Sequence, residues 1–245
     1  MYTIDSRVRY SEVDVKRRLT LEALMNYYQD CSTFQSEDCG AGLDYMYDRN
    51  IAWVVSSWQV ITYRYPLLGE KIYVSTMPYG MKGFVGFRDF KIESESGELL
   101  SCANSVWALI NIKTGLPERI SDELLGKFVL EEKLDVEFPA RKISFPKDGE
   151  TFDAPEIVVV KSQLDTNRHV NNEQCIAMAR VSISEEGSLT PVRRLRAEYK
   201  QQARLGNTIY PFVNKRNIDG MDVCTVSLND SDKKPYAVIE FELAK

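Results

Sequence analysis

The chain has a single histidine, His169, and it shares a short segment with a carboxylate and a carboxamide, Asp165 and Asn167. In an extended segment, residues at alternate positions project to the same side, so these three side chains can converge. A neutral imidazole can take up a proton near pH 7. Asp165 can hold the imidazole tautomer or activate a water itself, and Asn167 can donate and accept hydrogen bonds. The spacing therefore predicts a site of general acid–base chemistry.

An internal repeat provides a control for this interpretation. The segment that ends at Asp14 resembles the segment that ends at Asp165. In the first copy, Lys16 and Arg18 stand where the second copy has its asparagine and histidine. Asp and Asn residues also build ordinary turns. Because both copies need the same turn but only the second carries Asn and His, the difference favours a chemical role for the second copy.

Each copy leads into a helical pattern and then into strands. Thr20 is a plausible N-cap in the first copy, and Asn171 or Asn172 in the second. Each cap precedes one apolar stripe at helical spacing, formed by Leu21, Leu24, Met25 and Tyr28, and by Cys175, Ile176, Ala179 and Ile183. Alternating segments rich in β-formers follow, separated by Gly turns. The order predicts an α+β fold in which each half is a curved antiparallel sheet wrapped around a long central helix.

The domain boundaries follow from the repeat. We expect an N-terminal domain at residues 1–130 and a C-terminal domain at residues 157–245. The stretch between them, residues 131–156, is rich in charge and proline, which is typical of a linker.

Composition excludes several classes of function. The net charge of −5 argues against a nucleic-acid partner. Five widely spaced cysteines form no CxxC pair, so we expect small buried thiols and neither a disulfide framework nor a metal site. No pattern indicates a cofactor. The apolar runs are too short to span a bilayer, and the first residues lack the apolar centre of a signal peptide, so we expect a cytoplasmic protein.

The chain resembles the acyl-acyl carrier protein thioesterases of plants and bacteria along nearly its whole length. The most specific match is the segment Asp165-Thr166-Asn167-Arg168-His169-Val170-Asn171-Asn172, which is similar to the family's Asp-x-Asn-x-His-Val-Asn-Asn signature. Further landmarks occur in the family's order: Trp53-Val54-Val55, Tyr65-Pro66 with Gly69 following, Arg88-Asp89, Trp107 and Lys113-Thr114. The resemblance implies a tandem (double) hot-dog fold in which the first half holds the acyl chain and the second supplies the chemistry. It also implies release of a fatty acid from an acyl carrier protein.

One position departs from the family pattern. Members commonly have Glu-Cys in a strand that begins Glu-Tyr-Arg-Arg, and this chain has Gln202 and Ala203 there. Alanine has no nucleophile, so no acyl-enzyme can form at that position, while Gln202 can position a water but cannot take its proton. We therefore predict direct attack by water, activated by His169 or Asp165, with lower activity than in Glu-bearing relatives.

Three alternatives remain open at this point. The carrier of the acyl group can be coenzyme A, or the chain can be a weakly active or non-catalytic acyl-chain binder.

Arg193, Arg194 and Lys200 are candidates for docking an acidic carrier protein. Met25 and Trp53 are candidates for lining an acyl tunnel, although such residues are usually core. The two halves can pair within one chain, so both a monomer and a homodimer are feasible.

Overall fold

Polar side chains set where the two long helices begin. In the computed structural model, which describes residues 1–183 and 190–244, the Thr20 hydroxyl accepts a hydrogen bond from the amide of Ala23 (3.2 Å). Helix α1 (Leu21–Asp38) starts directly after Thr20. Asn171 acts in the same way for α4 (Asn172–Ile183), because its side-chain oxygen accepts from the amide of Glu173 (3.2 Å). The predicted N-cap at Thr20 is confirmed, and Asn171 is the cap of α4.

The chain divides into two compact units, Met1–Phe138 and Pro139–Lys245. Unit 1 contains an antiparallel sheet whose strands lie in the order β1-β3-β4-β5-β2. Its bounds are β1 Tyr2–Arg7, β2 Ile51–Thr62, β3 Lys71–Lys82, β4 Val85–Ser94 and β5 Leu99–Asn111. Three short helices complete the unit: η1 (Tyr10–Glu12), α2 (Leu43–Arg49) and α3 (Asp122–Gly126).

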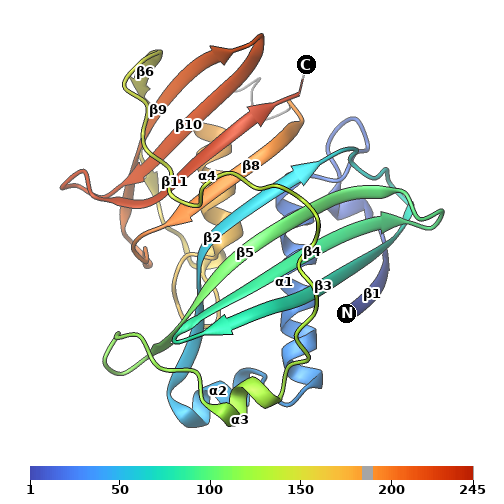
Figure 1. The fold of residues 1–245 in the computed structure, drawn as a ribbon. Helices are drawn as coiled ribbons and strands as arrows, with labels where there is room; N and C mark the ends of the chain where they lie inside the picture. Colours follow the sequence, from blue (N-terminus) through green and yellow to red (C-terminus); the bar gives the residue numbers. More distant parts are fainter. Residues whose placement is uncertain (184–189, 245) are drawn as a thin grey trace. The chain divides into compact units, whose positions relative to one another are not determined.

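Helix α1 packs against this sheet through β1 and β3, and Figure 1 shows it running across the sheet face. Aromatic side chains fill the space between them. The Tyr28 ring lies 6.2 Å from the Trp58 ring and 5.2 Å from the Phe90 ring, centroid to centroid, and all three side chains are fully buried. This aromatic contact holds helix and sheet together in the interior of unit 1.

Unit 2 repeats the arrangement of a helix packed on an antiparallel sheet. Its antiparallel sheet has the order β8-β11-β10-β9-β6, with β7 also paired to β9. The bounds are β6 Glu150–Asp153, β7 Ile157–Val158, β8 Val192–Tyr199, β9 Thr208–Ile218, β10 Met221–Asn229 and β11 Pro235–Leu243, with a short helix η2 at Lys161–Gln163. Helix α4 packs on β9, β10 and β11, as Figure 1 shows. Each unit therefore has the α+β arrangement expected from the sequence.

One strand lies inside the stretch that the sequence suggested as a linker. Strand β6 pairs with β9, with Phe152 opposite Val213, and the Lys215 ammonium lies 5.0 Å from the centre of the Phe152 ring. The proline and charge content of residues 131–156 hid this strand, because its β-formers Thr151 and Phe152 are too few to give a periodic signal. Among the described residues, no helix has the length and apolar character to cross a membrane.

We predict that Thr20→Ala lowers the free energy of unfolding of unit 1 by about 1 kcal/mol, because it leaves an amide of α1 without its cap. All three tryptophans lie in unit 1, so a urea titration followed by tryptophan fluorescence reports on that unit. The matched control is Thr33→Ala, an exposed threonine in the interior of the same helix. Equal effects of the two substitutions would contradict the capping role.

Candidate active site

The Asp165 carboxylate folds the loop that carries His169. Its Oδ1 accepts hydrogen bonds from the amides of Asn167 (2.8 Å) and His169 (3.0 Å). The Asp165 amide donates in turn to the His169 carbonyl (2.8 Å), and Arg168 turns the chain with a positive φ of 61°. The loop thus closes on itself, and the side chains of Asp165 and His169 are held at its two ends.

The loop of unit 1 has the same geometry without the same chemistry. Asp14 Oδ1 accepts from the amides of Lys16 (2.8 Å) and Arg18 (2.9 Å), and Arg17 also has a φ of 61°. Here the Arg18 guanidinium donates to the second carboxylate oxygen, with distances of 2.9 and 3.0 Å. The carboxylate therefore binds the loop amides in both units, and in unit 1 it also pairs with the side chain four positions later. In unit 2 that side chain is the imidazole of His169.

A distant segment lies directly beside His169. The amide of Val170 donates to the carbonyl of Ala203 (2.9 Å), and His169 pairs with Arg204 in an isolated antiparallel bridge. Gln202, the residue before this contact, is exposed. The structure thus brings the segment of Gln202 to the loop of Asp165, Asn167 and His169.

Burial and charge set the protonation state of His169, which is half-buried. Burial lowers the pKa of its imidazole below the ordinary value of about 6.5, the positive charge of Arg204 lowers it further, and Asp165 opposes both. A lowered pKa keeps the imidazole neutral at pH 7. His169 is therefore in the form that can accept a proton from water.

Two groups near His169 can interact with a carbonyl. Asn167 is exposed, so its carboxamide faces solvent. In the first turn of α4, the Glu173 amide is already bound by the Asn171 side chain (3.2 Å) and is not free to bind a substrate carbonyl. The Tyr199 phenol donates to the Asn172 carbonyl (3.0 Å) and fixes the start of α4 to the end of β8. Asn167 is thus the more accessible partner for a developing oxyanion.

No thiol in the described part of unit 2 can replace the cysteine missing at position 203. Burial, with the Glu173 charge, raises the pKa of Cys175 to about 12, so this thiol stays protonated. The Cys224 thiol is also buried, and burial raises its pKa too. Within the residues described, no cluster of His, Cys, Asp or Glu could hold a metal ion. The arrangement suits attack by water and not by a protein nucleophile.

The two candidates for the acyl tunnel lie in unit 1, in different surroundings. Met25 is fully buried on α1. Trp53 is half-buried and packs on a small core cluster of Ala41, Met46, Leu109, Leu124 and Phe128. Burial of both is what core packing alone requires, so their role in acyl binding stays a prediction.

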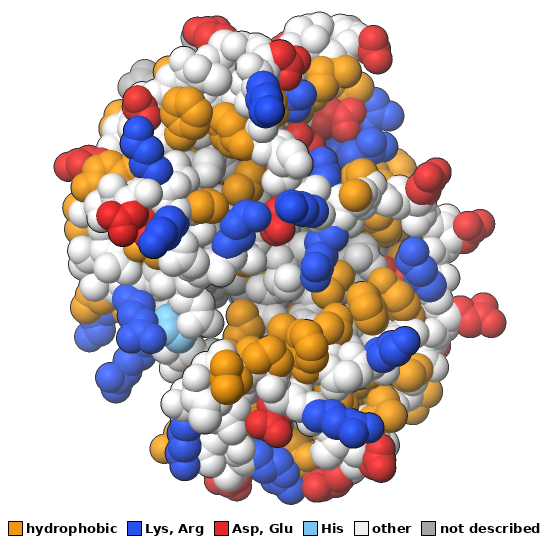
Figure 2. Space-filling model, turned by 60° about the vertical axis from the view of Figure 1, so that its left-hand side comes forward, with side chains coloured by type: hydrophobic (Ala, Val, Ile, Leu, Met, Phe, Trp, Pro, Cys, Tyr) orange, Lys and Arg blue, Asp and Glu red, His pale blue; other side chains and the backbone are white. Residues whose placement is uncertain are grey.

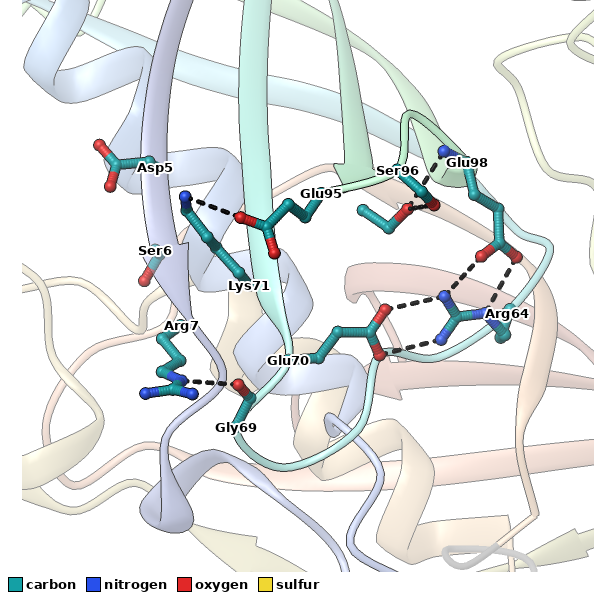
Figure 3. A pocket seen from close by; sticks show the side chains of 11 residues that line it. Asp5, Ser6, Arg7, Arg64, Gly69, Glu70, Lys71, Glu95, Ser96 and Glu98 are labelled. Atoms are coloured by element: carbon teal, nitrogen blue, oxygen red, sulfur yellow. Dashed lines mark hydrogen bonds and ion pairs between the residues drawn. The ribbon is translucent and has the colours of Figure 1, made fainter.

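A surface pocket of about 980 Å³ lies in unit 1, and Figure 3 shows its charged lining. Arg64 lies between two carboxylates, with its nearest nitrogens 2.8 Å from Glu70 and 2.6 Å from Glu98. The Arg64 guanidinium lowers the pKa of both carboxyl groups. Lys71 pairs with Glu95 (3.1 Å). Arg64 and Lys71 are thus paired with acids of the pocket, Arg7 donates to the carbonyl of Gly69 (2.7 Å), and none of the predicted catalytic residues lines the pocket.

Comparison with known proteins decides the family. Residues 1–128 match the acyl-ACP thioesterase N-terminal domain. A chloroplastic acyl-[acyl-carrier-protein] hydrolase of Cuphea viscosissima is 32% identical over 213 residues, which cover 80% of this chain and 50% of the relative. The chain belongs to the acyl-ACP thioesterase family. The resemblance predicted from the sequence is confirmed, and the chain spans about half the length of the curated relatives that it matches.

Solved structures place the chain in the hot-dog fold. A Lactobacillus plantarum protein assigned as an oleoyl thioesterase superimposes with a TM-score of 0.90 at 20% identity, covering 100% of this chain and 96% of the other. The 12:0-ACP thioesterase from Umbellularia californica gives 0.85 at 20% identity, with coverages of 99% and 93%. The hot-dog fold predicted from the sequence is confirmed.

Sequence reasoning on this member of the acyl-ACP thioesterase family missed the position of Arg204. Its neighbour across the bridge, His169, is 35 positions away in the chain, so no local pattern links the two. The signal that could have found it is the repeat. In unit 1, Arg18 pairs with Leu67 in the equivalent bridge, and the two loops align around it.

We predict that His169 titrates below its ordinary value of about 6.5. Because the chain has one histidine, its imidazole gives one set of NMR signals to follow against pH. Arg204→Met should raise the midpoint, since it removes a positive charge, and Asp165→Asn should lower it, since it removes a negative one. Arg193→Met, an exposed arginine on β8, is the control and should leave the midpoint unchanged. A wild-type midpoint above 6.5 would contradict this account.

Proposed function

We propose that the protein hydrolyses the thioester of fatty acyl-acyl carrier protein and releases a free fatty acid and the carrier thiol. The observation that carries the proposal is the loop of Asp165. This loop contains the family signature, and its histidine, His169, has a neutral imidazole. The unit 1 loop has the same hydrogen bonds but carries Lys16 and Arg18. Membership of the acyl-ACP thioesterase family supports the substrate class.

In the proposed reaction, a water molecule attacks the thioester carbonyl while His169 takes its proton. Asp165 holds the imidazole in position and stabilises the imidazolium that forms. Asn167 stabilises the negative charge that develops on the carbonyl oxygen. Collapse of the tetrahedral intermediate breaks the carbon–sulfur bond, and the imidazolium returns its proton to the leaving thiolate. Gln202 orients the attacking water without taking its proton.

The acyl chain, in this proposal, is held by unit 1, where Met25 and Trp53 are the candidate contacts. A panel of acyl-carrier and acyl-CoA substrates of different chain length tests the function through the release of free thiol. Release from the carrier-bound substrates supports the proposal. Preference for acyl-CoA indicates an acyl-CoA thioesterase, and fatty-acid binding without release from any thioester indicates a binding protein.

Removing the base should abolish most of the activity. We predict that His169→Ala lowers kcat/KM by about 10²–10⁴-fold, the usual contribution of a general base. Changes within about twofold, or less than about 0.5 kcal/mol of transition-state stabilisation, would show that His169 is not the base.

The two equivalent aspartates separate turn formation from chemistry. Asparagine keeps a side-chain oxygen for the loop amides in both Asp165→Asn and Asp14→Asn, so both loops should persist. We predict that Asp165→Asn lowers kcat/KM by at least about tenfold, because the imidazolium loses its charged partner. Asp14→Asn should remain within about twofold of the parent. Equal losses in the two variants would assign the carboxylate a purely structural role.

Restoring the family's acid should increase the rate. We predict that Gln202→Glu raises kcat, because an exposed carboxylate next to the Ala203–Val170 contact can share the proton transfer. Gln201→Glu, one residue earlier and also exposed, is the matched control and should have no such effect. An unchanged or lower kcat in Gln202→Glu would show that the site works without this acid.

A further inference from the structure

Two of the three basic residues that the sequence suggests for docking are paired with neighbouring acids. Arg194 on β8 lies 3.5 Å from Glu242, and Lys200, just after β8, lies 3.2 Å from Glu198. Such pairs offset much of the positive charge on this sheet. Positive charge that stays available in unit 2 must come from cations without such a partner.

Arg204 is a cation of this kind. Its side chain is exposed, and no carboxylate in residues 1–183 or 190–244 forms an ion pair with it. Its main chain is held in place, because its amide donates to the side-chain oxygen of Asn207 (2.8 Å) and its carbonyl accepts from the Asn207 amide (3.0 Å). The guanidinium thus extends from a fixed point and leaves its charge available to a ligand.

The bridge between the two segments directs the side chains of Arg204 and His169 to the same face. Its main-chain hydrogen bond lies beside the pair, from the Val170 amide to the Ala203 carbonyl (2.9 Å). Opposed residues of such a pair have Cα atoms about 4.5 Å apart and neighbouring side chains. The Arg204 charge accordingly acts on the imidazole, whose pKa it lowers. Figure 2 shows the one histidine of the chain at the surface with Lys and Arg side chains next to it.

The fold does not require an arginine at this position. In unit 1 the equivalent bridge joins Arg18 to Leu67, so a leucine suffices there. The arginine of unit 2 also has a cost, since its charge opposes the imidazolium that forms when His169 takes up a proton. A positive charge beside the base favours the reaction only if it also acts on an anion that forms in the same step.

Thioester hydrolysis forms such an anion beside the base. As the water oxygen bonds to the carbonyl carbon, one proton of the water passes to His169 and the π electron pair of the carbonyl moves onto the carbonyl oxygen. The attacked carbonyl is separated from the imidazole by one water molecule, so the oxyanion forms close to the base. Guanidinium groups donate short, charge-assisted hydrogen bonds to anionic oxygens.

We propose that Arg204 is a further catalytic residue, whose guanidinium donates to the oxyanion of the tetrahedral intermediate together with Asn167. This inference rests on the proposed thioesterase function. When the intermediate collapses, the electron pair returns to the carbonyl, the carbon–sulfur bond breaks, and the imidazolium protonates the leaving thiolate. The charge on the oxygen exists only between attack and collapse, so Arg204 stabilises the transition states more than the bound substrate.

A role of Arg204 confined to the imidazole predicts the opposite result. If the arginine only lowers the pKa of His169, its removal leaves a stronger base, and the rate stays equal or rises at a pH where the imidazole is neutral. If the arginine binds the oxyanion, the rate falls although the base is stronger. The sign of the change in kcat therefore separates the two roles.

The test is Arg204→Leu, which introduces the residue of the equivalent bridge in unit 1 and keeps the main-chain bonds to Asn207. The value of kcat for an acyl-carrier or acyl-CoA substrate is measured about two pH units above the His169 midpoint of each variant, where the imidazole is neutral. We expect kcat to fall by at least about tenfold. The dissociation constant of a thioether analogue, in which a methylene replaces the carbonyl, should change by less than about twofold, since this ligand forms no oxyanion.

Two further variants serve as controls. Arg204→Lys keeps the charge, so its loss of kcat should be smaller than that of Arg204→Leu. Lys161→Gln removes an exposed charge from η2 in the same unit and should retain the kcat of the parent.

The role at the oxyanion would be overturned by an unchanged or higher kcat in Arg204→Leu, by equal losses in Arg204→Leu and Arg204→Lys, or by an equal loss in Lys161→Gln. A weakening of thioether binding as large as the loss of kcat would also overturn it. Failure of the parent to release thiol from any thioester would instead refute the proposed function itself.

Discussion

The arrangement of the site depends on one carboxylate oxygen. Asp165 Oδ1 binds two backbone amides of its own loop, at 2.8 and 3.0 Å, and together with the bond from the Asp165 amide to the His169 carbonyl these bonds hold His169 at a fixed distance from Asp165. The same constraint acts at Asp14. A turn that is built mainly from backbone atoms tolerates different side chains at its other positions, so one loop can carry lysine and arginine and its repeat asparagine and histidine.

The surroundings of the loop determine its electrostatic state. Helix α4 begins two residues after Val170, and the Val170 amide is bound by the carbonyl of Ala203. This contact places the histidine in a half-buried position, where desolvation favours the neutral ring. Arg204 enters the same environment because it follows Ala203. The local geometry that positions the base therefore also fixes which charges act on it.

Much of this could be predicted from the sequence, for identifiable reasons. Thr20 and Asn171 are caps, and a cap depends only on residues within one turn of the helix. The repeat of Asp14 and Asp165 revealed the shared loop, since both signals are local. The pairing of Arg196 with Glu240 was not predictable in the same way, because the register of two strands 44 positions apart in the chain decides it. The proximity of Arg204 and His169 escaped detection for the same reason, whereas strand β6 was missed because it is too short to give a periodic signal.

The contact at Ala203 has a consequence for how such a site can change over time. The residue serves the fold through its main-chain carbonyl, and in unit 1 the corresponding carbonyl belongs to Pro66, which binds the amide of Leu19 (2.8 Å). A proline and an alanine thus serve equally well there. The side chain at this position is buried, so its size is limited, but the architecture does not depend on its chemical nature. A nucleophilic thiol could be lost or gained at this point while the loop, the helix and the neighbouring strand keep their places, and a change of reaction mechanism need not disturb folding.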